Sequence, residues 1–117
     1  MTVRLNKEAL ALARTLVREG DVVRDERDDW SEHAPSTAEE NAFIEKHGMS
    51  EYAKWHLAED TAETEGTKGR LKFPYGDFRR VHRCAVISGE SRAGQHDHTS
   101  IEKALRDLLA DIDGDQS

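Results

Sequence analysis

The sequence predicts a mainly α-helical single domain over residues 1–113, with four helices and room for one short β-hairpin. Three observations support this fold class. A chain of 117 residues suits one domain. Its apolar residues, 36% of the total, recur at helical spacings rather than in long runs. Helix-capping patterns precede some of these stretches. Because charged residues make up 35% of the chain, the core must be small.

The first predicted helix covers residues 7–19, where the apolar residues form one stripe. Asn6 is a suitable N-cap for it, and Gly20 suits the position just after its end. The next stretch, residues 21–34, is rich in Asp, Glu and Arg. It is predicted to be a loop or a short extended segment, with Trp30 as its one large anchor.

Three further helices are predicted, over residues 36–47, 77–92 and 99–112. Ser36 and Glu39 have the spacing of a capping box, in which each residue bonds the backbone N–H of the other. Asp77 is the expected N-cap of the next helix. The last helix has the strongest apolar stripe of the chain, and the polar residues 114–117 after it are expected to form a disordered tail.

The β structure is expected in the middle of the chain. Residues 70–75 alternate apolar and basic side chains, as a strand does. Pro74 places this strand at an edge. Residues 55–59 are its expected partner in a two-stranded element. The stretch 50–60 as a whole stays ambiguous, because it fits either a short helix or an extended segment.

Charge is unevenly distributed along this chain of net charge −7. Residues 19–66 contain fifteen acidic and four basic residues, whereas residues 67–92 contain seven basic and two acidic ones. The basic residues could pair with the acidic ones inside the fold, or they could form a surface for an anionic partner. The residues assigned to such a surface are Lys68, Arg70, Lys72, Arg79, Arg80 and Arg83. The primary hypothesis is a non-enzymatic interaction or accessory module that uses this basic segment, residues 68–83, as its contact surface.

The second hypothesis is a His/Asp metal-binding protein or a small metal-dependent hydrolase. His96 and His98 flank Asp97 in a predicted turn, and imidazole and carboxylate groups bind zinc or nickel. His56 or His82 would have to close such a site. The alternative is a solvated turn at residues 96–98, with His56 as a hydrogen-bonded structural residue.

No complete catalytic set is recognised, so we assign no catalytic residue and no cofactor. Cys84 lies in an apolar run, which favours a small core residue over a nucleophile, although Arg83 is adjacent. Phosphate-binding glycine loops and nucleophile-elbow motifs are not found. The interleaved basic and aromatic residues of the basic segment allow a third hypothesis, single-stranded nucleic-acid binding. A chain with a pI of about 5.3, however, repels polyanions at long range.

The run TKGRLKFPYGDFRRVHRCAVISGESRAGQHDHTSIEKALRDLL resembles a family of small uncharacterised bacterial proteins, chiefly actinobacterial. WHLAED and the pattern PST–EN–FI–HG fit the same family, so the resemblance covers roughly residues 30–110. A weaker similarity, over about residues 67–110, is to segments of phage head proteins and their associated proteases. No protease nucleophile or base is matched. The resemblance implies an accessory or phage-derived role and no known activity.

The remaining expectations concern location and partners. The single cysteine rules out an internal disulfide, and no stretch approaches the roughly 18 apolar residues of a membrane span. The N-terminus lacks the apolar run of a signal peptide. We therefore expect a cytoplasmic protein without membrane contact, monomeric or homodimeric, whose partner is a protein or an anionic ligand.

Overall fold

The computed structural model describes residues 3–114, which contain six α-helices, one 3-10 helix and five strands. The helices are α1 (Lys7–Arg18), α2 (Trp30–His33), α3 (Thr37–His47), α4 (Met49–Ala53), η1 (Lys68–Arg70), α5 (Arg83–Gln95) and α6 (Thr99–Gly114). The strands are β1 (Val3–Leu5), β2 (Val22–Val23), β3 (His56–Asp60), β4 (Leu71–Pro74) and β5 (Val81–His82). The mainly α class with minor β structure is confirmed, but the helix count differs from the four predicted.

The β structure forms two small sheets instead of the one expected hairpin. In the first sheet β3 pairs antiparallel with β4, as predicted, and β1 pairs antiparallel with the other edge of β3. In the second sheet β2 pairs parallel with β5, which is distant in the sequence. The ambiguous stretch 50–60 contains both alternatives, because α4 is followed directly by β3.

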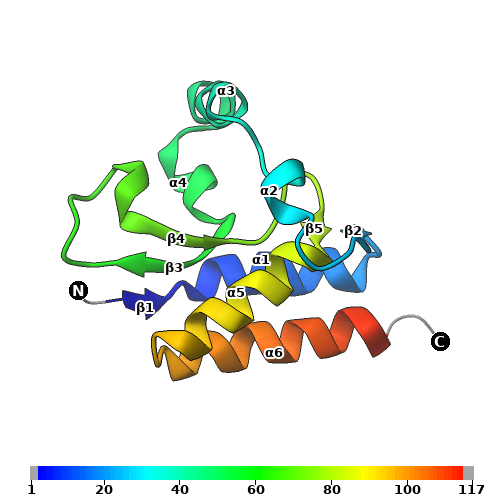
Figure 1. The fold of residues 1–117 in the computed structure, drawn as a ribbon. Helices are drawn as coiled ribbons and strands as arrows, with labels where there is room; N and C mark the ends of the chain where they lie inside the picture. Colours follow the sequence, from blue (N-terminus) through cyan, green and yellow to red (C-terminus); the bar gives the residue numbers. More distant parts are fainter. Residues whose placement is uncertain (1–2, 115–117) are drawn as a thin grey trace.

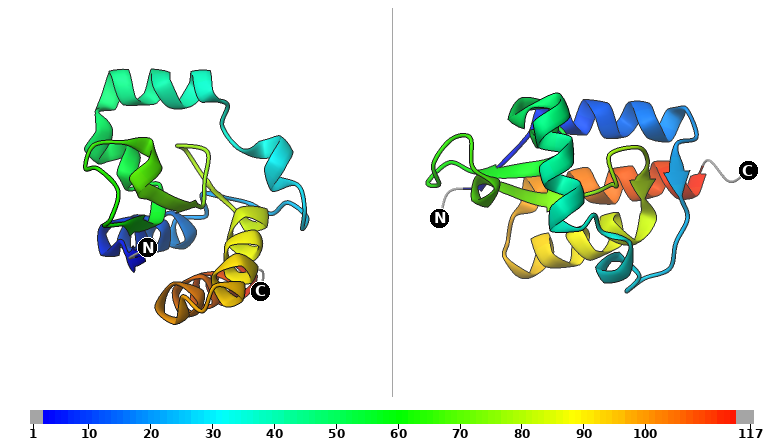
Figure 2. Two further views of the ribbon diagram at one scale, coloured as in Figure 1. Left: turned by 60° about the vertical axis from the view of Figure 1, so that its left-hand side comes forward. Right: turned by 90° about the horizontal axis from the view of Figure 1, so that it is seen from above.

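The apolar core lies between the first sheet and the three longest helices. α5 and α6 lie side by side, and α1 packs against α6 (Figures 1 and 2). The Asn6 side chain accepts a hydrogen bond from the backbone N–H of Ala9 (3.2 Å), so α1 begins where the sequence predicts. The largest fully buried side chains are Tyr75, Leu57, Ile101, Leu105, Leu108, Ile112, Val81, Val86 and Cys84.

α3 has the predicted ends but contributes only the partly buried Phe43 to the core. Both hydrogen bonds of the capping box are present: Glu39 N–H donates to Ser36 Oγ (3.2 Å), and Ser36 N–H donates to Glu39 Oε1 (3.1 Å). No residue of α3 is buried, and the helix projects from the body of the molecule (Figure 2). Phe43 stacks on Phe78, with ring centroids 4.4 Å apart. Local capping therefore defines α3 more than burial does.

The predicted helix over residues 77–92 is wrong at its N-terminal end. The Asp77 carboxylate accepts hydrogen bonds from the backbone N–H groups of Arg79 (3.0 Å) and Arg80 (2.8 Å), which closes a turn instead of starting a helix. Phe78, inside this turn, has a φ of 73°, in the left-handed region. The chain then forms β5, and α5 begins only after it.

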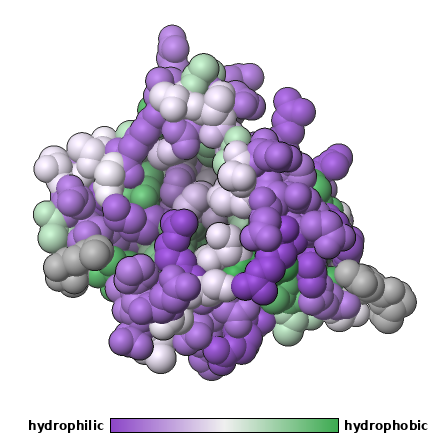
Figure 3. All heavy atoms as spheres, viewed as in Figure 1, coloured by the Kyte–Doolittle hydropathy of each residue, from purple (hydrophilic) through white to green (hydrophobic). Residues whose placement is uncertain are grey.

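Two further expectations concern the chain end and the surface. Of the predicted tail, residues 115–117 lie outside the described residues, and Gly114 is the last residue of α6. Among residues 3–114, no helix has the length and apolarity needed to cross a bilayer. Hydrophilic residues cover most of the face seen in Figure 3, and hydrophobic residues form only small areas on it.

Candidate metal centre

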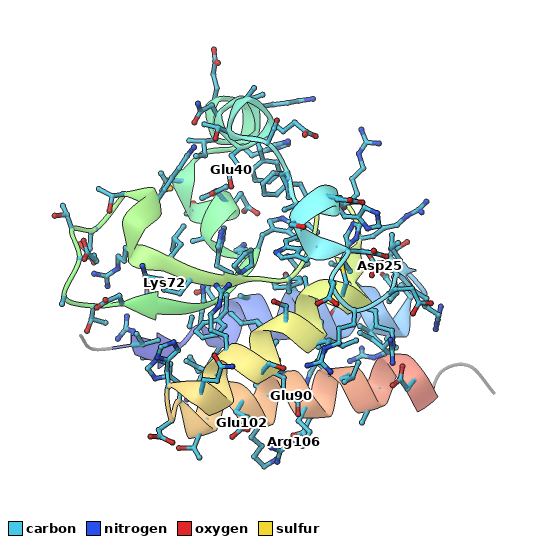
Figure 4. All side chains as sticks on the ribbon, in the orientation of Figure 1. Asp25, Glu40, Lys72, Glu90, Glu102 and Arg106 are labelled. Atoms are coloured by element: carbon cyan, nitrogen blue, oxygen red, sulfur yellow. The ribbon has the colours of Figure 1, made fainter. Side chains whose placement is uncertain are left out.

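Four side chains meet where the chain leaving β2 passes the start of α5. The parallel pairing of β2 and β5 explains the meeting, because Val23 lies opposite His82. The same alignment, continued by two residues, brings Asp25 beside Cys84. His33, the last residue of α2, reaches the same point from the other side. We call Asp25, His33, His82 and Cys84 the Asp25 cluster; Asp25 is labelled in Figure 4.

A single oxygen is the centre of the Asp25 cluster. Asp25 Oδ2 lies 2.7 Å from His33 Nδ1, 2.7 Å from His82 Nδ1 and 3.0 Å from Cys84 Sγ. The other oxygen, Oδ1, accepts the backbone N–H of Cys84 at 2.8 Å, so Asp25 also caps the start of α5. One potential ligand atom from each of the four residues lies within 4.8 Å of the other three.

Asp77 contacts the ring nitrogen of His82 that faces away from the centre of the cluster. His82 Nε2 lies 2.8 Å from Asp77 Oδ2, while Asp77 Oδ1 is fixed by the two backbone N–H groups of its own turn. The imidazole of His82 is therefore held between two carboxylates. One ring nitrogen, Nε2, faces Asp77, and the other, Nδ1, faces the centre of the cluster.

Burial and hydrogen bonding set the protonation of the cluster. Burial alone would raise the pKa of the Asp25 carboxyl, but hydrogen bonds from Cys84, His33 and His82 outweigh it and hold that pKa far below its usual range. Burial, reinforced by the hydrogen bond to Asp25, raises the pKa of the Cys84 thiol far above its usual range. The Asp25 carboxylate raises the pKa of His33. The cluster thus holds an ionised carboxylate beside a protonated thiol.

The four groups form a ligand set for a borderline divalent metal such as zinc. Tetrahedral zinc holds nitrogen and oxygen at about 2.0–2.2 Å and sulfur at about 2.3 Å, which places ligand atoms roughly 3.3–3.8 Å from one another. In the structure Asp25 Oδ2 lies 2.7–3.0 Å from the other three atoms, so these contacts would have to lengthen around a bound ion. Cysteine nucleophilic chemistry is disfavoured, because Cys84 is fully buried and its thiol pKa is raised.

The metal ligands predicted from the sequence lie elsewhere. The rings of His96 and His98 are stacked 6.1 Å apart at the turn between α5 and α6, with Asp97 between them. These three residues do not belong to the converging group found among residues 3–114. His56 does not close this site: it is buried in β3, where its Nδ1 lies 3.1 Å from the Tyr52 carbonyl oxygen. His82 belongs to the Asp25 cluster instead.

The six residues assigned to the anionic-partner surface are spread over three places. Three lie on or near η1 and β4, where Figure 4 shows Lys72 well away from Asp25. Half of the six form ion pairs within the chain, and these pairs are Lys68–Glu40 (3.3 Å), Arg70–Glu59 (3.2 Å) and Arg83–Asp113 (2.8 Å). The side chains of Arg79 and Arg80 are exposed and make no hydrogen bond or ion pair within residues 3–114. The interaction-module hypothesis stays a prediction.

Sequence reasoning missed the Asp25 cluster, although one signal of it was present. His82 and Cys84 are two residues apart, a spacing that brings side chains to the same face of an extended chain. In the helix predicted for residues 77–92 the same spacing turns them away from each other. No sequence pattern marked Asp25 or His33 as a ligand, because the charged stretch that contains them is typical of a solvent-exposed loop.

Comparisons of the chain with protein-family models, curated proteins and solved structures found no match. The resemblance to small bacterial proteins therefore stays a prediction, and no residue role is carried over from another protein. The role of the Asp25 cluster is argued from its own geometry.

Proposed function

We propose that this protein binds one zinc-like divalent metal ion through Asp25, His33, His82 and Cys84. The metal fastens the 24–36 segment, which holds Asp25 and His33, to the start of α5. This proposal keeps the metal-binding class of the second sequence hypothesis, and of the residues named there it retains only His82. It rests on one observation: two imidazole nitrogens and a thiol converge on a single oxygen of a buried carboxylate.

More side-chain atoms meet at one oxygen of Asp25 than that oxygen has lone pairs. A carboxylate oxygen has two lone pairs, yet three side-chain atoms lie within 3.0 Å of Asp25 Oδ2. A divalent ion at the centre of the group would replace these contacts by four coordinate bonds. The Cys84 thiol would then bind as thiolate, because a coordinating thiol loses its proton.

The contact between His82 and Asp77 is the supporting arrangement that metal-bound histidines commonly show. Such a histidine donates its second ring N–H to a carboxylate, which fixes both the tautomer and the ring orientation. Asp77 Oδ2 is 2.8 Å from His82 Nε2. His82 Nδ1 is then directed at the centre of the cluster.

The 24–36 segment gives the metal a structural role. Trp30 is its one large apolar side chain, and its helix α2 buries no residue. Metal binding contributes folding free energy to segments of this kind, because the site does not exist in the unfolded chain. Four protein ligands also leave tetrahedral zinc without an open position, which is typical of structural sites.

Elemental analysis of the full chain, purified under reducing conditions, tests the proposal. We expect about one zinc per chain, together with a cobalt derivative that shows thiolate-to-metal charge-transfer absorption. His33→Gln and Cys84→Ser should each lower zinc occupancy at least tenfold, since each removes one ligand. The double variant His96→Gln/His98→Gln is the matched control and should keep its zinc.

Two outcomes would overturn the proposal. One is a chain without stoichiometric metal whose melting temperature responds neither to zinc nor to a chelator; Asp25 would then be only a hydrogen-bonded cap of α5. The other is loss of zinc in the His96/His98 control but not in Cys84→Ser, which would move the site to the turn between α5 and α6.

A further inference from the structure

An open recess of about 680 Å³ adjoins the Asp25 cluster. One wall is formed by α5 and the other by the 24–36 segment, with Trp30 between the recess and the cluster. Trp30 lines the recess, and its ring lies 5.5 Å from the ring of His82, measured between centroids. None of the four proposed metal ligands lines this recess, so it is a separate candidate site.

The α5 wall is a polar stripe along one face of the helix. Ser88, Ser91, Arg92 and Gln95 all line the recess. Their spacings of three, four and seven residues place them on the same face of a helix. Such a stripe near the end of a helix usually faces solvent. Here the 24–36 segment faces it and adds Arg27 and Ser31.

Both arginines of the recess lack a carboxylate partner within the described residues. Arg27 donates only to Ser91 Oγ, at 3.3 Å, and the Arg92 side chain makes no hydrogen bond or ion pair within residues 3–114. Arg4, Arg70, Arg83 and Arg106 are each paired with a carboxylate, whereas Arg79 and Arg80, which lie outside the recess, are not paired in the part of the chain that the structure describes. Asp28 is the one acidic residue in the lining, and it forms no ion pair with either arginine. Two guanidinium groups without a carboxylate partner therefore line one recess.

We propose that this recess binds a phosphate monoester that carries a planar group. The phosphate lies between Arg27 and Arg92, and the planar group packs on the exposed part of the Trp30 ring. A phosphate presents three acceptor oxygens. Guanidinium and hydroxyl donors from two walls match it better than they match the two oxygens of a carboxylate. Aromatic side chains stack planar groups such as bases with useful affinity.

Calorimetric titration of the full chain at low ionic strength tests this assignment with three probes. Phenyl phosphate carries both features, inorganic phosphate carries only the anion, and benzoate is a planar carboxylate. We expect phenyl phosphate to bind more tightly than either of the other two. Arg92→Gln should weaken it roughly tenfold, because the lost group makes charge-assisted hydrogen bonds. Trp30→Leu should weaken phenyl phosphate and leave inorganic phosphate unchanged.

Arg79→Gln is the matched control, since Arg79 is also exposed and unpaired but lies outside the recess. It should leave the affinity for phenyl phosphate unchanged. A loss in Arg79→Gln without a loss in Arg92→Gln would move the anion site to the basic segment and overturn the proposal. So would the absence of binding at millimolar phenyl phosphate, or equal affinity for benzoate. Zinc content measured on Arg92→Gln should equal that of the parent protein, which keeps this test separate from the metal proposal.

Discussion

The apolar core and the 24–36 segment are held in place by different kinds of contact. In the core, α1, α5, α6 and the first sheet bury many side chains against one another, and Leu105 and Leu108 are almost inaccessible to solvent. In the 24–36 segment one buried carboxylate, that of Asp25, makes three hydrogen bonds to the rest of the fold, and the side chains of Arg24 and Arg27 make further ones at the surface. Burial spreads stability over many residues, whereas a polar cluster concentrates it in a few.

Replacing Asp25 should have the largest effect on stability and tests whether this carboxylate holds the 24–36 segment in place. Asp25→Ala leaves His82 and Cys84 without their acceptor and α5 without its cap, so we expect a loss of about 3–5 kcal/mol in unfolding free energy. Leu108→Ala, a core substitution, should cost a similar amount, about 2–5 kcal/mol. Urea denaturation of both variants in a chelator would measure the two losses.

Hydrogen exchange separates the two regions further. Asp25→Ala should speed the exchange of amides in the 24–36 segment much more than that of amides in α6, because the segment can open locally. Leu108→Ala should speed both. A cost below about 1 kcal/mol for Asp25→Ala would mean that packing, and not the carboxylate, holds the segment.

The pH dependence of stability sharpens the comparison, with a somewhat smaller expected effect. Burial lowers the pKa of His56 to about 4 in the folded protein, whereas a histidine side chain in the unfolded chain has a pKa near 6.5. Between about pH 6.5 and pH 4, His56 is therefore protonated in the unfolded state and neutral in the folded state. His56 contributes its full stabilisation above about pH 6.5, and about 3 kcal/mol is lost as the pH falls to about 4.

The Asp25 carboxyl should respond in a different range, whereas His33, whose pKa Asp25 raises, adds stability as the pH falls toward the unfolded value of about 6.5. The pKa of Asp25 is also lowered, but its unfolded value is near 3.9, so its contribution is lost only below about pH 4. Unfolding free energies measured in a chelator from pH 7 to pH 4 should fall most in Asp25→Asn, less in the parent protein, where His33 offsets part of the loss, and should not fall in His56→Gln. An unchanged pH slope in His56→Gln would contradict the assignment of this loss to His56.

The two regions also differ in how far the sequence predicts them. The Asn6 cap, the capping box of Ser36 and Glu39, and the apolar stripe of residues 99–112 are local signals, and each predicts a helix that the structure contains. The pairing of residues 55–59 with 70–75 is also predicted correctly, because residues 70–75 alternate and the two stretches are neighbours in the sequence.

The candidate site could not be predicted in this way. It depends on the parallel pairing of two dipeptide strands, Val22–Val23 and Val81–His82, which are too short to leave a periodic pattern. Asp77 carries the same composition signal for a helix cap and for a turn, and only its hydrogen bonds to Arg79 and Arg80 distinguish the two. The misplaced helix start then hid the relation between His82 and Cys84.

The smallest expected effect concerns α3, which resembles neither region because it has a strong cap and no buried residue. Ser36→Ala removes the hydroxyl that accepts the Glu39 N–H, at a cost of about 1 kcal/mol. Since α3 contributes little to the core, this loss should appear as local opening, with α3 amides exchanging roughly fivefold faster and α6 amides unchanged. Ser50→Ala, at an exposed serine that caps no helix, is the control and should change neither. Faster exchange of α6 amides in Ser36→Ala would show that α3 opens only together with the core, and the stacking of Phe43 on Phe78 would then be the contact that couples them.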